Sequence, residues 1–207
     1  MRFGFENITL VDGDIVEASN LNRQNYTEQN LLKSKAESLH DRLISINSKA
    51  NIKYYAEYIS QENLLEIIAN HKIIINALDF TSEIPLLLDK VCQENNITIL
   101  HPYNLGWGGL VTVIKPNGHR LESIADEKFN ELKMVEYVSS YLRFWKTPKE
   151  WLEKVIEEYK NKKELLPPPQ LSIASWIVAG MCTHIMYNIL SEKTFKTFPE
   201  FYIQSII

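Results

Sequence analysis

The sequence predicts an α/β fold with a mainly parallel sheet and flanking helices. Three short runs, at residues 7–11, 71–78 and 96–101, are almost continuously apolar, as are the strands of a parallel sheet that is buried on both faces. Helical periodicity separates each run from the next, which gives the order strand, helix, strand, helix, strand. We expect a single domain over residues 1–207, since a chain of this length can bury a core unaided.

The other elements of the predicted domain follow in order along the chain. A weaker strand, IKYYAEY, lies between the first two apolar runs. The spacing of apolar residues predicts three helices, at residues 29–47, 61–70 and 82–95. Thr81 and Ser82 could cap the third of them. The segment GGLVTVIKPNG then indicates a further strand that ends in a turn at residues 116–118.

The chain becomes highly charged from about residue 122 to residue 165, and we expect a helical insertion there. The prolines at 167–169 would end it, and a last helix follows at 171–190, with Ser172 as its expected cap. The insertion carries three large aromatic residues among its charges, namely Trp145, Trp151 and Tyr159. This mixture suits a surface that binds a partner or covers a dimer, although a helical hairpin packed on its own domain would look the same.

Composition and cysteine usage limit the class of protein. The net charge is −4 and the pI is about 5.8, so the chain lacks the basic field that nucleic acid would require. Cys92 and Cys182 lie far apart and form no CxxC pair, so we expect neither a disulfide framework nor a structural zinc site. A cytoplasmic location fits this pattern. Polar residues interrupt the apolar stretch at 174–190, which favours a core helix over a membrane span.

The segment VDGDIVEASNLNRQ is the most informative part of the sequence. It follows a predicted strand, at the end of the sheet where open α/β sheets bind ligands. Its polar residues are Asp12, Asp14, Glu17, Ser19, Asn20, Asn22, Arg23 and Gln24. Asp12 could accept hydrogen bonds from two ribose hydroxyls, while Arg23 could bind phosphate oxygens that Asn20 and Gln24 orient. A long solvated turn is the alternative.

The pattern D-x-D-x-V-E-x-S-N-L-N-R-Q resembles the signature of the ThiF/MoeB/HesA family, whose Rossmann-like fold also forms the adenylation domain of ubiquitin-activating enzymes. LLKSKAES is similar to the family's helix start and places Lys35 at a lysine that contacts the α-phosphate. INALDFTSE places Asp79 at the aspartate that holds Mg²⁺. NLGWGGLVTVIKP and PPPQLSIASWIVAG are similar to later segments. The sequence departs from the family at two points. Phe80 stands where asparagine commonly follows that aspartate, and the arginine that commonly comes a few residues later is absent, since no arginine lies between Arg42 and Arg120.

The resemblance implies ATP-dependent activation of a carboxylate, usually the C-terminal glycine of a ubiquitin-like or sulfur-carrier protein, by a homodimeric enzyme. The implied nucleotide site comprises Asp12, Asp14, Ser19, Asn20, Asn22, Arg23, Gln24, Lys35 and Asp79. Arg23, Lys35 and an Mg²⁺ ion on Asp79 are the implied catalytic cations, which could stabilise charge on phosphate oxygens. ATP and Mg²⁺ are therefore the expected cofactors.

Other functions remain open for the same residues. Lys35 could be a surface lysine and Asp79 a helix cap. A degenerate member of the family could keep the fold only to bind a carrier or to dimerise. An NAD-dependent oxidoreductase could use Asp12 for ribose, but it needs a dinucleotide loop and gives no reason for Arg23, Lys35 and Asp79 together.

Several further side chains could take part in chemistry. Members of the resembling family that bind their substrate as a thioester have a cysteine between the glycine-containing strand and the last helix. Residues 115–171 contain no cysteine. Cys92 and Cys182 lie in predicted helices among apolar residues and are expected to be buried, so we expect no thioester with the substrate. Residues 101–104 follow a strand end and could line the same crevice as Asp79. For His101 the alternative is a packed core residue.

The position of Asp12 so close to Met1 raises a final expectation. In the resembling family, a first strand and a glycine-rich loop come before the segment that matches MRFGFENITLVDGD. We therefore expect these parts to be missing from the chain, so that the strands at 7–11 and 71–78 flank a gap. A non-catalytic protein that closes the gap by pairing these two strands directly is the alternative.

Overall fold

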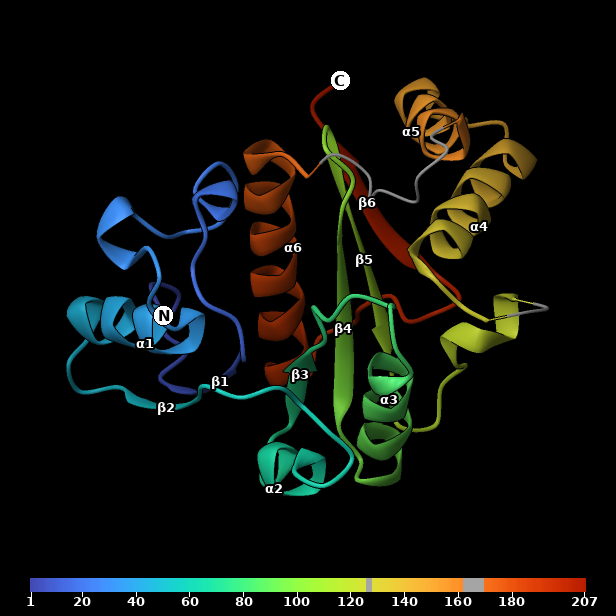
Figure 1. Cartoon of the computed structure of the whole chain (residues 1–207). Helices are drawn as coiled ribbons and strands as arrows, with labels where there is room; N and C mark the ends of the chain where they lie inside the picture. The colour runs from blue at the N-terminus through green and yellow to red at the C-terminus, as the bar shows by residue number, and fades with distance from the viewer. Residues whose placement is uncertain (126–127, 162–169) are drawn as a thin grey trace. The chain divides into compact units, whose positions relative to one another are not determined.

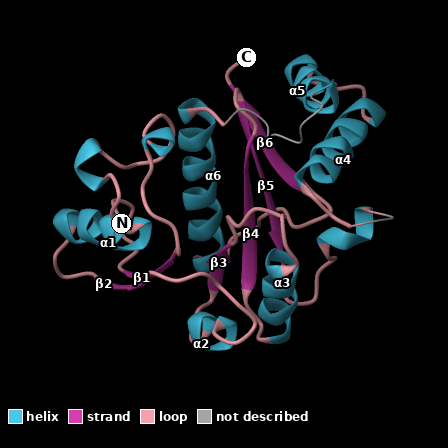
Figure 2. Ribbon diagram, viewed as in Figure 1, coloured by secondary structure: helices cyan, strands magenta, loops and turns pink. Residues whose placement is uncertain are grey.

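The computed structural model describes residues 1–125, 128–161 and 170–207 (Figure 1). The chain divides into two compact units, Met1–Leu64 and Leu65–Ile207. Strands and helices occur together in both units (Figure 2), and this confirms the predicted α/β class.

The first unit is a pair of parallel strands joined by a helix. Strand β1 (Asn7–Val11) pairs with β2 (Asn51–Tyr55), with Asn7 opposite Asn51. Helix α1 (Lys35–Ile46) begins six residues later than the sequence predicted. The reason is local, because residues 28–30 form a separate 3₁₀ turn, η2, and Leu32 has a positive φ of 64°. Ser34 then caps α1 by accepting a hydrogen bond from the Glu37 N–H.

The second unit contains a mixed sheet with the strand order β3-β4-β5-β6. The strands are β3 (Ile73–Ile75), β4 (Thr98–Asn104), β5 (Gly108–Ile114) and β6 (Phe201–Ser205). Only the β3–β4 pair is parallel, and both other pairs are antiparallel. β6 was not predicted from the sequence. Among the strands that the structure describes, β1 pairs only with β2, and β3 pairs only with β4 within its sheet.

The helices of the second unit cover both faces of its sheet (Figures 1 and 2). On one face lies α6 (Ser172–Leu190); on the other lie α4 (Glu131–Phe144) and α5 (Glu150–Asn161). Consecutive side chains of β6 point to opposite faces of the sheet. Phe201 contacts Tyr141 of α4, whereas Tyr202 packs against the core beneath α6. The remaining helices are α2 (Leu64–Ile68) and α3 (Ile84–Glu94), which contacts β4.

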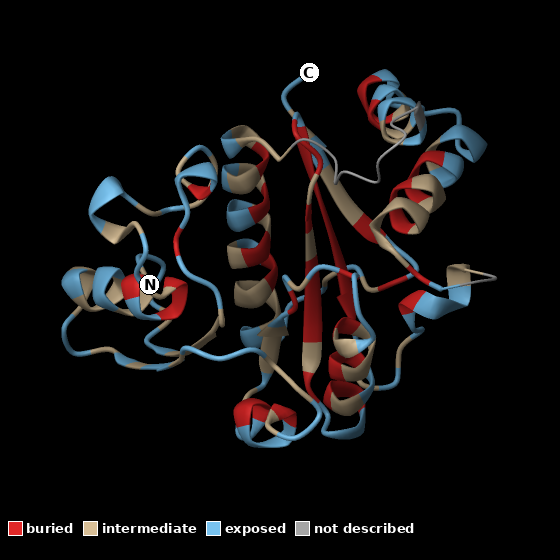
Figure 3. Ribbon diagram, viewed as in Figure 1, coloured by how far each residue is buried: buried red, intermediate tan, exposed pale blue. Residues whose placement is uncertain are grey.

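The core beneath α6 is apolar. Its buried residues are Leu100, Val111, Val113, Val178, Cys182 and Ile185, and Figure 3 shows the buried side of α6 turned toward the sheet. The predicted cap Ser172 is wrong, because the cap position is Leu171 and no side chain of its own caps the helix. Asn104 of β4 binds this end instead: its Nδ2 donates to the Leu171 carbonyl and its Oδ1 accepts from the Leu171 N–H.

Helix α6 also passes a test of length and composition for a membrane span, within the part of the chain that the structure describes. Helices in the cores of soluble proteins pass the same test. Val178 and Cys182 of α6 are buried against the sheet, whereas only 22% of the apolar span is buried. The helix therefore packs on the sheet with one face, and the prediction of a core helix holds for that face alone.

The predicted helical insertion corresponds to η3 (Leu121–Ile124), α4 and α5, while the prolines at 167–169 lie outside the described residues. Trp151 is 9% exposed and its ring lies close to Gly108 of β5, so it belongs to the core of its own unit. Trp145 is 60% exposed. Local packing therefore explains Trp151, and the role of Trp145 as a partner contact stays a prediction.

The contact between β5 and α6 leads to a prediction on stability. A Cβ atom on Gly109 would lie 2.5 Å from Cγ2 of Val178, whereas one on Gly180 would meet nothing. We expect Gly109→Ala to lower the free energy of unfolding by about 1–3 kcal/mol through overpacking. Gly180→Ala is the control and should raise it by up to about 1 kcal/mol through helix propensity. Urea unfolding followed by circular dichroism measures both, and similar losses in the two variants would contradict the packing assignment.

Candidate functional site

The loop after β1 is held against the start of α1 by backbone hydrogen bonds. The Lys35 N–H donates to the Asp14 carbonyl, and the Val16 N–H donates to the Lys33 carbonyl, both at a donor–acceptor distance of 2.9 Å. Inside the loop, Asn20 is buried, and its Oδ1 accepts from the Glu17 N–H at 3.0 Å. Asn20 thus shapes the loop instead of projecting from it. These bonds bring the two ends of the predicted site, Asp14 and Lys35, together.

Asp14 and Lys35 form an ion pair at the first residue of α1. Lys35 Nζ lies 2.8 Å from Asp14 Oδ2, and the Tyr58 hydroxyl donates to Asp14 Oδ1 at 2.6 Å. The side chain of Lys35 is 11% exposed and that of Asp14 is 49% exposed. The hydrogen bond from Lys35, followed by that from Tyr58, lowers the pKa of the Asp14 carboxyl. The positive end of the helix dipole opposes a cation at this position, and the ion pair with Asp14 offsets part of the cost of burying Lys35.

Asp12 and Tyr26 lie next to this ion pair. Asp12 Oδ1 accepts from the Asp14 N–H at 2.9 Å, and burial raises the pKa of the Asp12 carboxyl while the charge of Lys35 lowers it. The Tyr26 hydroxyl donates to the Lys35 carbonyl over 3.3 Å. Burial, with the nearby Asp12 charge, raises the pKa of Tyr26 to about 12.

The sequence argument missed Tyr26 and Tyr58. Tyr58 is 44 residues from Asp14, so no local pattern links them. The available signal was Gly13, where an added Cβ atom would lie 2.7 Å from the Tyr58 ring. A side chain at that position would force the ring away from Asp14, which explains the small residue between two aspartates.

The other predicted loop residues surround Arg23. Its Nη1 donates to the Ser19 carbonyl at 2.6 Å and to Asn22 Oδ1 at 3.1 Å. The Gln24 N–H donates to the Asn20 carbonyl. The structure therefore places Arg23 among oxygens of its own loop, with its position set by Ser19 and Asn22.

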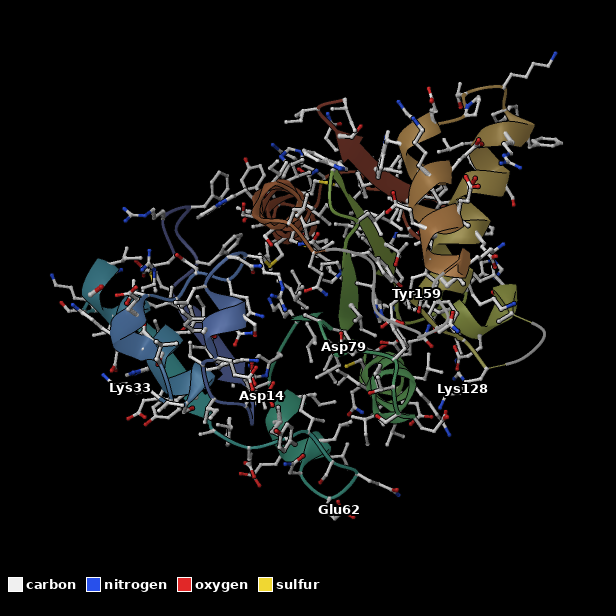
Figure 4. All side chains as sticks on the ribbon, turned by 45° about the horizontal axis from the view of Figure 1, so that its top comes forward. Asp14, Lys33, Glu62, Asp79, Lys128 and Tyr159 are labelled. Atoms are coloured by element: carbon white, nitrogen blue, oxygen red, sulfur yellow. The ribbon has the colours of Figure 1, made fainter. Side chains whose placement is uncertain are left out.

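Asp79 belongs to the second unit, whereas the other predicted site residues belong to the first. It lies on the loop between β3 and α3, where its side chain is exposed (Figure 4). Within the described residues, no three His, Cys, Asp or Glu side chains gather to hold a metal ion. Asp79 could supply a carboxylate oxygen to Mg²⁺, and phosphate oxygens and water would complete the coordination, as is usual for this ion.

Residues 101–104 do not line an open crevice as a group. His101 and Tyr103 are 1% and 5% exposed, and Asn104 binds the start of α6. The packed alternative for His101 is therefore confirmed. Cys92 and Cys182 are also buried, as predicted, and burial raises the pKa of each thiol to about 12.

The fold and the loop after β1 define a Rossmann-type α/β chain with a polar site at the carboxyl end of a strand. The ThiF family model matches residues 1–205, and the chain belongs to this family. It is 33% identical over 119 residues to the sulfur carrier protein ThiS adenylyltransferase of Bacillus subtilis. The alignment covers 56% of this chain and 35% of that relative.

Solved structures of Escherichia coli MccB share the fold. The structure with MccA-N7isoASN has a TM-score of 0.67 at 16% identity, and the alignment covers 98% of this chain and 57% of MccB. The structure with ATP has a TM-score of 0.63 at 14% identity, covering 96% and 56%. The chain thus spans about one third to just over half of the length of these similar proteins.

The buried thiols lead to a prediction on covalent chemistry. Thiols with a pKa of about 12 are ionised to about one part in ten thousand at pH 8. We expect iodoacetamide to leave both cysteines unmodified in the folded protein and to modify both in urea. We also expect no reductant-labile adduct with a carrier protein in the presence of ATP. An adduct that disappears in Cys92→Ser or Cys182→Ser would contradict this prediction.

Proposed function

We propose that this protein adenylates a carboxylate at the expense of ATP, releasing pyrophosphate. The substrate is the C-terminal glycine of a ubiquitin-like or sulfur-carrier protein. Membership of the ThiF family supports the proposal, as does the name of the Bacillus subtilis relative. The single observation that carries it is Lys35, a buried cation held at a helix N-terminus beside a polar loop.

The residues suit attack of a carboxylate on the α-phosphorus of ATP. No general base is required, because a carboxylate is already ionised at pH 7. Negative charge grows on the phosphate oxygens, and Arg23 and Lys35 would stabilise it. Mg²⁺ would supply further positive charge when held by Asp79 and the phosphates. In the first unit, the half-buried Asp12 carboxylate would accept from the ribose hydroxyls.

The contacts of Lys35 define how it would act. Its ammonium group now lies 2.8 Å from Asp14, so a phosphate oxygen would share or replace this partner. Asp14 keeps a hydrogen bond from Tyr58 in either case, and its exposed carboxylate can be solvated. Asp14 and Tyr58 would hold Lys35 in place before ATP arrives, which reduces the cost of ordering the lysine on binding.

The partners follow from the same proposal. A carrier protein would bind with its extended C-terminus at the nucleotide, and the protein would work as a homodimer in the cytoplasm. The exposed Phe144 and Trp145 at the end of α4 are candidates for contact with a partner, since aromatic residues are enriched in interfaces.

Exchange of pyrophosphate into ATP tests the function. The assay combines the protein and Mg²⁺ with a panel of sulfur-carrier and ubiquitin-like proteins that end in Gly-Gly. We expect carrier-dependent exchange, and we expect Arg23→Ala, Lys35→Ala and Asp79→Asn each to lower the rate by about 10² to 10³, the usual cost of removing one group that stabilises transition-state charge.

Lys33→Ala is the matched control, because Lys33 is an exposed lysine two residues from Lys35 (Figure 4). It should keep the full rate. Full activity in all three site variants would contradict the assignment of the site. Absence of exchange with every carrier would instead favour the non-catalytic alternative.

A further inference from the structure

A buried polar network lies where β3, α3 and β4 meet. Its members are Asn76, Asp89 and His101, which are 3%, 2% and 1% exposed. Asp89 Oδ1 accepts from Asn76 Nδ2 at 3.0 Å and is 2.8 Å from His101 Nε2. With Asp89 Oδ1 as the acceptor of both contacts, Nε2 is the nitrogen of His101 that carries the proton. We call these three residues the Asp89 network.

Asn76 connects this network to the loop that carries Asp79. Its Nδ2 also donates to the Pro85 carbonyl in the first turn of α3, at 3.0 Å. Its Oδ1 accepts from the Leu78 N–H at 3.3 Å, and its own N–H donates to the Leu100 carbonyl of β4. One side chain therefore ties the end of β3, the following loop and the start of α3 together.

Phe80 provides a second connection on the other side of Asp79. Its ring stacks on His101 with centroids 5.9 Å apart and meets Phe129 edge-on at 4.9 Å. The Phe80 N–H donates to Glu131 Oε1 of α4 over 2.9 Å. The residues before and after Asp79, Leu78 and Phe80, are thus both anchored to the Asp89 network or its neighbours, while the Asp79 side chain is exposed.

Stability alone does not account for these polar groups. Burying a carboxylate is costly, and apolar residues of similar shape in place of a buried charged pair are often neutral or stabilising. Asp89 Oδ2 and His101 Nδ1 also have no hydrogen-bond partner among the described residues, which adds to the cost. Because hydrogen bonds are directional, the network instead holds the loop at residues 76–80 in one conformation.

We propose that Asp89 and His101 are positioning residues, which fix the loop at residues 76–80 and thereby the direction of the Asp79 carboxylate. The effect of this positioning on catalysis rests on the proposed function, whereas the ordering of the loop does not. Asp89 acts through Asn76, and His101 acts through Phe80 and through the orientation of Asp89.

The test uses the double variant Asp89→Leu/His101→Phe in the full chain. Leucine has the branching of aspartate and phenylalanine keeps a ring, so the packing is preserved while the polar contacts are lost. Hydrogen exchange by NMR reports on the Leu78 and Phe80 amides. We expect exchange at these amides to become about five- to tenfold faster, as the loss of about one hydrogen bond implies. The temperature of unfolding should stay the same or rise.

Two further variants sharpen the comparison. Asp89→Asn keeps an oxygen acceptor and should retain much of the protection at both amides. Ser139→Ala removes a buried hydroxyl from α4 and should leave both amides unchanged. If the double variant fails to fold, His101→Phe alone takes its place as the variant that loses a polar contact, and Asp89→Asn remains the variant that keeps its acceptor. Unchanged exchange at Leu78 and Phe80 in the folded double variant, or in folded His101→Phe where that replaces it, would overturn the proposal.

Pyrophosphate exchange then tests the catalytic consequence. In the double variant we expect kcat to fall by about 10- to 100-fold, the usual effect of removing residues that orient a ligand-binding group, with no loss of thermal stability. Faster loop exchange with an unchanged kcat would overturn the link to Asp79. If the parent protein itself shows no pyrophosphate exchange, the proposed function fails, and the hydrogen-exchange result still decides whether the network orders the loop.

Discussion

The second unit depends on the packing of α6 against the middle of its sheet. Val178, Cys182 and Ile185 contact the central strands β4 and β5, and Gly109 lets the helix approach closely. This contact fixes β4, on which β3 is paired in parallel register. The end of β3 determines where the chain turns into the loop of Asp79. The geometry of that loop is therefore set by apolar packing on the far side of β4 and by polar contacts beneath the loop itself.

The parts of the fold that could be predicted are those with a local cause. β1 was predicted with its observed bounds because a short, continuously apolar run has few alternatives. β6 was missed, because its place beside β5 depends on pairing with residues about 90 positions away. The start of α1 was predicted too early, since the apolar spacing continues through a 3₁₀ turn that Thr27 and Asn30 stabilise. The contact at the start of α6 was also missed, because Asn104, which provides it, lies 67 residues from Leu171.

The candidate site divides in the same way. The acidic and basic residues of the loop after β1 were visible as a pattern, and their contact with α1 follows from backbone bonds between residues 14–16 and 32–35. Tyr26 and Tyr58 were not inferred, because they contribute through hydroxyl groups that any tyrosine carries. Gly13 marks a close approach but does not identify Tyr58 as the partner. The sequence also gave no reason to connect Asp89 with His101, which occupy a helix and a strand and meet only in the core.

The open side of β3 has a consequence for how the protein behaves in solution. The strand consists of three isoleucines, Ile73–Ile75, and Ile75 is 43% exposed. Within its sheet, and among the described residues, β3 pairs only with β4. The strand has neither a proline nor a charge of the kind that protects natural sheet edges. A sheet edge of this kind is a template for the pairing of another extended chain. An uncharged apolar edge of this kind favours association between chains, and a charged residue in β3 would oppose it.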